Sequence, residues 1–477
     1  MITVTRSFRF ALDLNPAQEQ SVSQHAGAAR WAFNHALGMK VAAHREWRRQ
    51  VEAVVASGVD EQVARKSVRV RIPRHPDIKK HLNRIKGSPA TMLPPGQLGP
   101  ERPCPWWGEV STYAFQSAFD DCDRAWQNWM DSITGRRAGR VVGYPRFKRK
   151  GRCRDSFRLH HDVKRPTIRP DGYRRLILPR IGSVRLHDSG KQLARLVERG
   201  QAVVKSVTVA RGGHRWYASV LCEVRQSVAV PTRRQKDAGI VGVDWGVSKL
   251  ASLSTGEQVD NPRHLGRQLE RLAKAQKALA RTQRGSQGRV KAARRVGRLQ
   301  HEIAEQRATT MHQLTKRLAT GWSTVAIEDL NVAGMTRSAK GTVEQPGRNV
   351  RQKAGLNRSI LDAAPGEMRR QLSYKTSWYG SVLAVCGRFE ATSKTCSACG
   401  WRNPSLTLAV RVFTCQQCGV VIDRDVNAAL NIARTAVPLV EGDVKARGVA
   451  KIPRARTGTR DLATSKREGP APPGHPG

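Results

Sequence analysis

Acidic residues are scarce in this sequence. Asp and Glu together number 38 against 84 Lys and Arg, which gives a formal net charge of +46 over 477 residues. A solvated surface accounts for any single basic run, but it does not account for an excess of this size over a whole chain. Because phosphate neutralisation and counterion release reward such a charge, the composition predicts a protein that binds nucleic acid.

Long apolar runs and a secretory leader are also missing. No uninterrupted apolar stretch reaches the length that crosses a membrane, and the opening MITVTRSFRF lacks the composition of a signal peptide. The chain length suits several domains, and these absences favour a soluble cytoplasmic protein associated with the nucleoid. Five cysteines are scattered and are expected to be reduced thiols: Cys104, Cys122, Cys153, Cys222 and Cys386.

The other four cysteines form two CxxC pairs near the C-terminus. Cys396 and Cys399 make the first pair, Cys415 and Cys418 the second, and the gap between the pairs fits a structural zinc site. Four thiolates close a tetrahedral shell around Zn2+ and leave no position open for chemistry. We expect a zinc ribbon over residues 391–419; two disulfides or four buried thiols are the alternatives.

The N-terminal segment predicts a strand that leads into a helical region. Apolar residues alternate from Phe8 to Leu14, as in a half-buried strand. Asn15 and Pro16 then have the positions of a helix N-cap and a first helical residue, with Gln18 placed for a capping box. Helical patterns continue on both sides of the Pro- and Gly-rich stretch TMLPPGQLGPERPCPWWGE, and we expect a helical lobe over residues 16–139.

Between residues 140 and 230 the pattern changes to short, regularly spaced β runs. Two of them flank Gly212-Gly213, as the arms of a hairpin would. Together with residues 1–15, these runs predict a small β-barrel that the helical lobe interrupts.

One of these short runs, GYPRFKRKG, mixes basic and aromatic residues. Basic groups neutralise phosphates and aromatic rings stack on bases, so this run is a candidate nucleic-acid-binding element. A solvated edge strand is the alternative on local grounds. The candidate residues are Tyr144, Arg146, Phe147, Lys148, Arg149 and Lys150.

A second domain is expected over residues 236–390 and 420–436. GIVGVDWGV and GWSTVAIEDLNV each contain a continuous apolar run, typical of a strand covered on both faces. Between them, residues 261–320 carry 15 Lys or Arg against 3 Glu on two helical patterns, which predicts a basic helical hairpin over 262–319. The Pro-, Gly- and charge-rich residues 437–477 are expected to be disordered.

Three acidic spots stand out against the basic background: Asp244, Glu328-Asp329 and Asp423-Asp425. Taken singly, Asp244 fits a turn, Glu328 a strand end and Asp425 a helix N-cap. Taken together, two of them end apolar strands and the third opens a helix directly after the cysteine module. Carboxylates gathered at strand ends can hold two Mg2+ ions, which activate water and stabilise the leaving oxygen of a phosphodiester.

These motifs resemble the TnpB family, transposon-encoded relatives of type V CRISPR effectors. The likeness rests on GVDWGV, AIEDLNV, TSKTCSACGW, FTCQQCG and DRDVNAALNIA, and in the first half on FRFALDLNPAQEQ, ARWAFNHAL, GYPRFKRKG and DSFRL. It implies a multidomain α/β fold, in which a wedge β-barrel interrupted by a helical recognition lobe precedes an RNase H-like (RuvC) nuclease domain with an inserted zinc ribbon. It also implies Asp244, Glu328 and Asp425 as the catalytic, magnesium-binding acids, because Asp425 and not Asp423 belongs to the family's D-x-N-A-A element.

The function that the resemblance implies is RNA-guided DNA cleavage by a transposable element. The partners would be a guide RNA and double-stranded target DNA, and the cofactors structural Zn2+ and catalytic Mg2+. Trp245 departs from the smaller aliphatic residue that the family has there, but removes no metal ligand.

Several alternatives stay open. One is a nuclease-inactive RNA-guided repressor or accessory DNA-binding factor, and another is a stand-alone type V CRISPR effector. A third is a transposase, although no motif supplies a tyrosine nucleophile. The sequence leaves open both a monomer and a homodimer.

Overall fold

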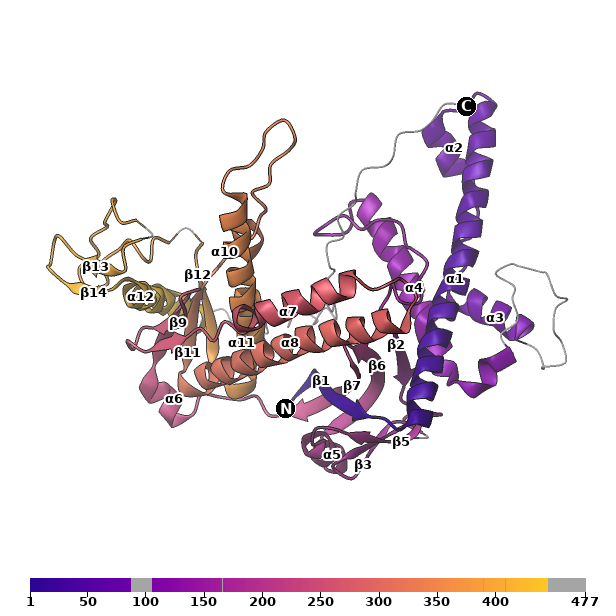
Figure 1. The fold of residues 1–477 in the computed structure, drawn as a ribbon, viewed down its shortest axis with the longest axis horizontal. Coiled ribbons are helices and arrows are strands. Elements are labelled where there is room, and N and C mark those ends of the chain that lie inside the picture. Colours follow the sequence, from indigo (N-terminus) through magenta and orange to yellow (C-terminus); the bar gives the residue numbers. More distant parts are fainter. Residues whose placement is uncertain (87–104, 165, 389, 408, 445–477) are drawn as a thin grey trace.

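The computed structural model describes residues 1–86, 105–164, 166–388, 390–407 and 409–444, with side chains to Ala436. Figure 1 shows two bodies, each a sheet with helices, and a small cysteine module at one end of the molecule. Helices α7 (His264–Ala280) and α8 (Gln287–Gly321) extend from the second body toward the first. Within the described ranges, no helix combines the length and apolar character that crossing a membrane requires.

The first sheet, with seven strands in the described residues, is antiparallel throughout. β1 (Ile2–Asp13) pairs with β7 (Arg215–Gln226) on one side and with β5 (Gly182–Leu186) on the other. The first strand therefore joins the strands that follow residue 140, as the sequence predicts. The hydrogen-bonded row runs β2-β6-β7-β1-β5-β4-β3, so its closure into a barrel stays a prediction. The remaining strands are β2 (Ser156–His160), β3 (Arg169–Asp171), β4 (Arg175–Leu178) and β6 (Ala202–Gly212).

Helices α1 (Pro16–Ala56) and α4 (Thr112–Ile133) pack on this sheet. α1 begins at the predicted capping box: Asn15 Oδ1 accepts from the Gln18 backbone N–H at 2.8 Å, and Gln18 Oε1 accepts from the Asn15 N–H at 3.3 Å. Sheet residues such as Phe8 and helix residues such as Phe33 share one buried core. The smaller helices are α2 (Glu61–Ser67), α3 (His75–Ile85), the 3-10 helix η1 (Pro105–Glu109) and α5 (Lys191–Glu198).

The second sheet has five strands in the part of the chain that the structure describes. Its order is β10-β9-β8-β11-β12, with β8, β11 and β12 parallel and β9 antiparallel to both of its neighbours. The two expected buried strands are β8 and β11. The bounds are β8 (Ile240–Trp245), β9 (Lys249–Leu253), β10 (Gln258–Asp260), β11 (Thr324–Glu328) and β12 (Val382–Cys386).

Helices cover both faces of the second sheet. Leu318 of α8 and Leu372 of α11 (Pro365–Tyr379) pack on one face, and Ile432 of α12 (Arg424–Val444) packs on the other. Gly242 allows α12 to lie directly on β8, because a Cβ at this position would stand 1.9 Å from the Ala429 carbonyl oxygen. Helices α6 (Arg233–Ala238), α9 (Val332–Met335) and α10 (Val350–Ala363) complete this body.

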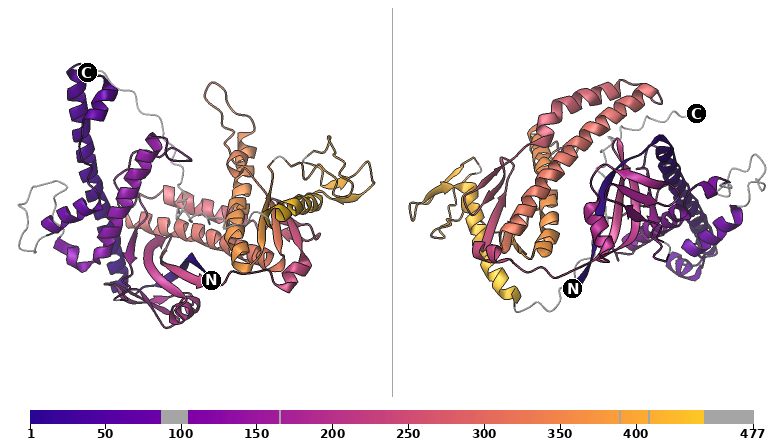
Figure 2. Two further views of the ribbon diagram at one scale, coloured as in Figure 1. Left: turned by 180° about the vertical axis from the view of Figure 1, so that it is seen from behind. Right: turned by 90° about the horizontal axis from the view of Figure 1, so that it is seen from below.

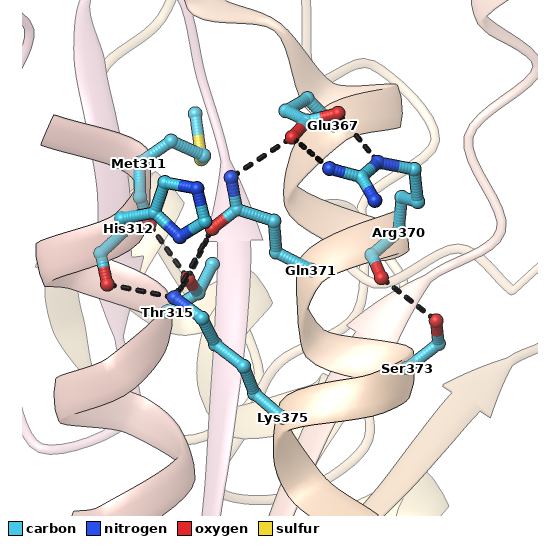
Figure 3. A network of polar contacts seen from close by, with 8 residues as sticks. All are labelled: Met311, His312, Thr315, Glu367, Arg370, Gln371, Ser373 and Lys375. Atoms are coloured by element: carbon cyan, nitrogen blue, oxygen red, sulfur yellow. Dashed lines mark hydrogen bonds and ion pairs between the residues drawn. The ribbon is translucent and has the colours of Figure 1, made fainter. Parts of the chain in front are cut away.

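A buried polar network joins α8 to α11 (Figure 3). Lys375 Nζ donates to the His312 carbonyl at 2.8 Å, to Thr315 Oγ1 at 2.7 Å and to Gln371 Oε1 at 3.1 Å. The Gln371 amide in turn donates to Glu367 Oε1 at 2.9 Å. Burial lowers the pKa of Lys375 to about 8. The network fixes the two helices that cover one face of the sheet.

Helix α8 also links the two bodies. α7 and α8 form the predicted basic hairpin, and α8 reaches the β6–β7 turn of the first sheet (Figure 2). Gly213, with φ of 60°, meets Gly297 there, since a Cβ on Gly213 would lie 2.9 Å from the Gly297 carbonyl oxygen. The Tyr217 hydroxyl and the His301 ring are hydrogen-bonded beside this contact.

The C-terminal helix differs from expectation at its far end. α12 includes residues 437–444, which the sequence predicts to be part of the disordered tail. Residues 445–477 lie outside the described residues, as do Cys104 and most of the Pro- and Gly-rich stretch before it. The cysteine module before α12 contains one antiparallel pair, β13 (Val412–Thr414) and β14 (Val421–Asp423).

Candidate active site and metal centre

Asp244 and Glu328 lie at the same level on neighbouring parallel strands. β11 pairs with β8 in register up to Ile327 opposite Val243, so the next residues along, Glu328 and Asp244, stand side by side. Residues two apart on a strand face the same way, and Ala326 packs with α12. Both carboxylates are therefore on the face of the sheet that α12 covers.

Helix α12 supplies the third carboxylate. Asp423 caps this helix, because its Oδ1 accepts from the backbone N–H of Asp425 at 2.9 Å and of Val426 at 3.0 Å. The alternative interpretation of Asp425 as the N-cap is therefore wrong. Asp425 instead pairs with Arg424, whose Nη2 and Nε lie 2.9 and 3.2 Å from its Oδ1.

Glu328 and Asp425 are close enough to Asp244 to alter the ionisation of its carboxyl group. Burial, followed by the negative charges of Glu328 and Asp425, raises the pKa of Asp244 to about 7, and Arg424 opposes this rise. A carboxyl that resists ionising beside two further carboxylates, at strand ends in a basic protein, has the character of a cation site. The structure thus brings together the three acids that sequence reasoning selected.

The two acids at the end of β11 have different surroundings. Glu328 Oε1 accepts a hydrogen bond from the Thr392 hydroxyl at 2.5 Å. Asp329 pairs with Arg369 and with Arg388, and these hydrogen bonds lower the pKa of Asp329. Glu328 is therefore the member of the pair that faces the acidic cluster. Sequence reasoning missed Thr392, which only the fold brings to this site.

The four cysteines gather as their spacing predicts. Their Sγ atoms all lie within 4.8 Å of one another, and among the described residues they are the only group of three or more metal-ligating side chains drawn together to this degree. The two CxxC pairs form equivalent turns. The Gly400 N–H donates to the Cys396 carbonyl and the Gly419 N–H to the Cys415 carbonyl, both at 3.0 Å, and both glycines have positive φ. The eight described cysteines form no disulfide. The donor set and the paired turns suit a tetrahedral Zn2+ site.

Two asparagines of α12 hold the cysteine module in place. Asn427 Oδ1 accepts from the Ser397 N–H at 2.8 Å, and its amide donates to the Thr395 carbonyl at 2.7 Å. Asn431 donates to the carbonyls of Thr392 and Thr395 at 2.8 and 2.6 Å. The same contacts therefore position Thr392 beside Glu328. Asn427 belongs to the DVNAA motif that identified Asp425, so the motif could have indicated a role for it, but sequence reasoning assigned none.

The segment GYPRFKRKG is not a strand, contrary to expectation, because helix α1 binds its backbone. The Asn34 side chain accepts from the Lys148 N–H at 2.7 Å and donates to the Lys148 carbonyl at 2.8 Å. Lys148 Nζ lies 3.9 Å from the centre of the Phe33 ring, and Tyr144 packs edge-on against Trp129. The structure leaves five of the six candidate side chains exposed, although Tyr144 only partly so: Tyr144, Arg146, Phe147, Arg149 and Lys150.

Comparisons with known proteins agree with these features. A family model described as "Probable transposase" matches residues 219–339, and one described as "Cas12f1-like, TNB domain" matches residues 366–432. A model described as "Helix-turn-helix domain" matches residues 1–49, which in this structure form β1 and most of α1.

Two full-length relatives fix the family. A Mycobacterium tuberculosis protein named "Putative RNA-guided DNA endonuclease" is 35% identical over 448 residues, which cover 91% of this chain and 87% of that protein. An Escherichia coli protein with the same description is 33% identical over 428 residues, covering 90% and 91%. The chain belongs to the TnpB family of IS605-type transposon proteins.

Solved structures show a more distant likeness. A Cas12f1–sgRNA–target DNA complex aligns with 90% of this chain and 99% of its own chain, at 12% identity and a TM-score of 0.45.

Proposed function

We propose that this chain is an RNA-guided DNA endonuclease that hydrolyses phosphodiesters at Asp244, Glu328 and Asp425. The observation that carries the proposal is the convergence of these carboxylates from β8, β11 and α12 within a chain of net charge +46. Acids that repel nucleic acid acquire a role in such a protein when cations bridge them to phosphate. The names of the two full-length relatives support guided DNA cleavage by this chain.

We infer an RNase H-like, RuvC-type arrangement for the second body. Its support is the strand order β10-β9-β8-β11-β12, with one acid at the end of the central strand and another beside it on β11. The domain takes residues 236–390 and 420–436, with the zinc ribbon at 391–419 inserted before the third acid. For the first body we infer a wedge barrel, residues 1–15 and 140–230, around a recognition lobe of residues 16–139.

The donor set fits Mg2+, which takes a few carboxylates and keeps other positions for water and phosphate oxygens. Bound at this cluster, such ions would supply an activated water and stabilise the leaving oxygen. A nearby cation would favour the ionised form of Asp244, whose pKa is raised by burial and by the neighbouring carboxylates. Thr392 orients Glu328 through Oε1, and Arg424 orients Asp425 through Oδ1, with Arg411 3.9 Å from the other oxygen of Asp425.

The partners we assign are a guide RNA and double-stranded target DNA. The basic hairpin α7–α8 and the exposed residues of the 144–150 segment are the surfaces assigned to them. Because these surfaces would act through phosphate neutralisation, reversing charges along the hairpin should weaken binding and flatten its dependence on salt.

The test begins with the RNA. The protein is expressed with its native flanking DNA and purified in high salt, and the RNA that stays bound is sequenced. One abundant RNA, followed by Mg2+-dependent cutting of DNA that matches it, supports the proposal. A single bound RNA without cutting would favour the repressor or accessory factor, and a mixture of unrelated RNA without guided cutting would refute the guided function.

A further inference from the structure

The helical part of the first body contains a pocket that the proposed cleavage chemistry does not use. It has a volume of about 580 Å3 and lies between the C-terminal half of α1, α2, the connection after α2, and α4. Figure 1 shows α2 beside this part of α1, at the opposite end of the molecule from the second sheet. This volume is in the range of sites that bind small molecules or single groups of a larger ligand.

Aromatic rings gather at this pocket. His44 stacks on Trp47 with ring centres 5.6 Å apart, and meets Trp126 and Trp129 edge-on at 5.8 and 5.4 Å. Trp126 and Trp129 are buried, whereas Trp47 is half-buried and presents part of its ring to the pocket. Aromatic residues make up 5% of this chain, so three tryptophans around one opening indicate a stacking surface.

The charges around the pocket suit a nucleotide. Arg48 lines it and is exposed, and the structure gives Arg48 no ion pair with another described residue. Arg65 lines the opposite side in an exposed pair with Glu61 at 2.6 Å. Glu52 adds a carboxylate that can accept from an exocyclic amino group. Burial, with a contribution from Arg48, lowers the pKa of His44 and keeps its ring neutral.

The basic segment that follows α4 contacts residues that line the pocket. Tyr144 packs against Trp126, Trp129 and His44, and its hydroxyl lies 3.4 Å from His44 Nδ1. The exposed cations Arg146 and Arg149 follow a few residues later. A chain of phosphates that runs along this segment would therefore bring a base to the aromatic opening.

We propose that this pocket binds one unpaired nucleobase of the guide RNA, stacked on Trp47, with Arg48 on the adjoining phosphate. The base is one with an amino group, which Glu52 can recognise. The proposal rests on the proposed function, because it takes its ligand from the RNA partner. RNA is favoured over target DNA because DNA arrives as a duplex with its bases paired, whereas structured RNA presents unstacked bases in loops and ends.

The experiment measures binding of 12-nucleotide oligo(A), oligo(C) and oligo(U) RNA, and of the matching DNA, to the full chain freed of RNA. Trp47→Leu should weaken binding of oligo(A) or oligo(C) RNA about tenfold, because one stacking platform is lost. It should leave the salt dependence unchanged, whereas Arg48→Gln should lower the salt slope by about one. Trp107→Leu is the matched control, since Trp107 is also half-buried but does not line the pocket.

Other outcomes overturn the assignment. Unchanged RNA affinity in Trp47→Leu would refute the pocket, and a loss confined to DNA would assign it to the target. A changed oligomeric state with normal RNA binding would make it an interface between copies. Because these assays need no cleavage, they are separable from the proposed function: a chain that never cuts DNA can still lose RNA binding through Trp47→Leu.

Discussion

The cysteine site and the acidic site of this protein are assembled in opposite ways. The four cysteines lie within 23 positions of sequence, from 396 to 418, and their sulfur atoms all lie within 4.8 Å of one another. The three acids come from β8, β11 and α12, and burial together with the charges of Glu328 and Asp425 raises the pKa of Asp244 where they meet. The first site is organised by a short segment, and the second exists only when a whole sheet and the helix on it have formed.

This contrast predicts the largest effect for removal of a zinc ligand. Cys415→Ser should lower the zinc content from about one equivalent and abolish protection from hydrogen exchange over residues 391–423, because ligand binding and folding of such modules are coupled. Metal analysis and hydrogen exchange measure both effects. Cys153→Ser, outside the module, should change neither. A Cys415→Ser protein with full zinc and full protection would contradict the assignment.

Removal of the Asp244 carboxylate, in contrast, should make the protein more stable. The folded pKa of Asp244 is about 7 against 3.8 for an unperturbed Asp, so the folded state binds the proton more tightly and this group destabilises the protein as pH rises from 3.8 to 7. Asp244→Asn should therefore increase the free energy of unfolding at pH 8, without Mg2+, by about 1–3 kcal/mol.

Denaturant unfolding at pH 5 and at pH 8 measures this gain, which should be larger at pH 8. Asp329→Asn is the control, because Asp329 is stabilised by two arginines and should show no gain. A loss of stability in Asp244→Asn at both pH values would mean that burial and the neighbouring acids do not disfavour the ionised Asp244 carboxylate in solution.

The hydrogen bonds that hold the cysteine module on α12 can be removed without touching a zinc ligand or a catalytic acid. Asn427→Ala removes the side chain that binds Ser397 and Thr395 and leaves buried groups unpaired, at a cost of about 1–3 kcal/mol. Zinc content should stay complete while cleavage falls, because Asn431 would be the one remaining asparagine that holds the module, and with it Thr392, against α12. Asn403→Ala, whose side chain bonds within the module, should leave cleavage intact. Equal cleavage by both variants would show that docking of the module is dispensable.

The smallest expected effect is the pH dependence of the stability that the buried polar network between α8 and α11 contributes. The folded pKa of Lys375, about 8, is below its unperturbed 10.5, so stability from this group rises as pH increases from 8 to 10.5. Between pH 8 and 10.5, the unfolding free energy of wild type should rise by about 1 kcal/mol relative to that of Lys375→Met. Lys316 is exposed on α8, so Lys316→Met should show no such pH-dependent change. If the stability difference between wild type and Lys375→Met does not change with pH, the Lys375 ammonium is in water and the buried network is contradicted.

Sequence reasoning predicted features that depend on neighbours in the chain. The capping box at Asn15, the β6–β7 hairpin, the buried strands β8 and β11 and the cysteine cluster follow from local spacing. The meeting of Asp244 and Glu328 was also accessible, because ends of parallel strands share one edge of a sheet.

Features that depend on distant partners were not accessible. The strand expected at GYPRFKRKG failed because Asn34, more than 100 residues earlier, binds the backbone of Lys148 as a neighbouring strand would. The role of Asp423 as the helix cap depends on the geometry with which β14 enters α12. The close approach of Gly213 and Gly297 requires both bodies to be folded.

The most direct test of the acidic site is DNA cleavage by the RNA-loaded protein with and without Mg2+. Wild type and Asp329→Asn should cut matching DNA when Mg2+ is present, and Asp244→Asn should be slower by about a thousandfold or more while it still binds RNA and zinc. Cutting by Asp244→Asn at the wild-type rate, or by wild type without any divalent cation, would contradict the assignment of these three carboxylates as the catalytic centre.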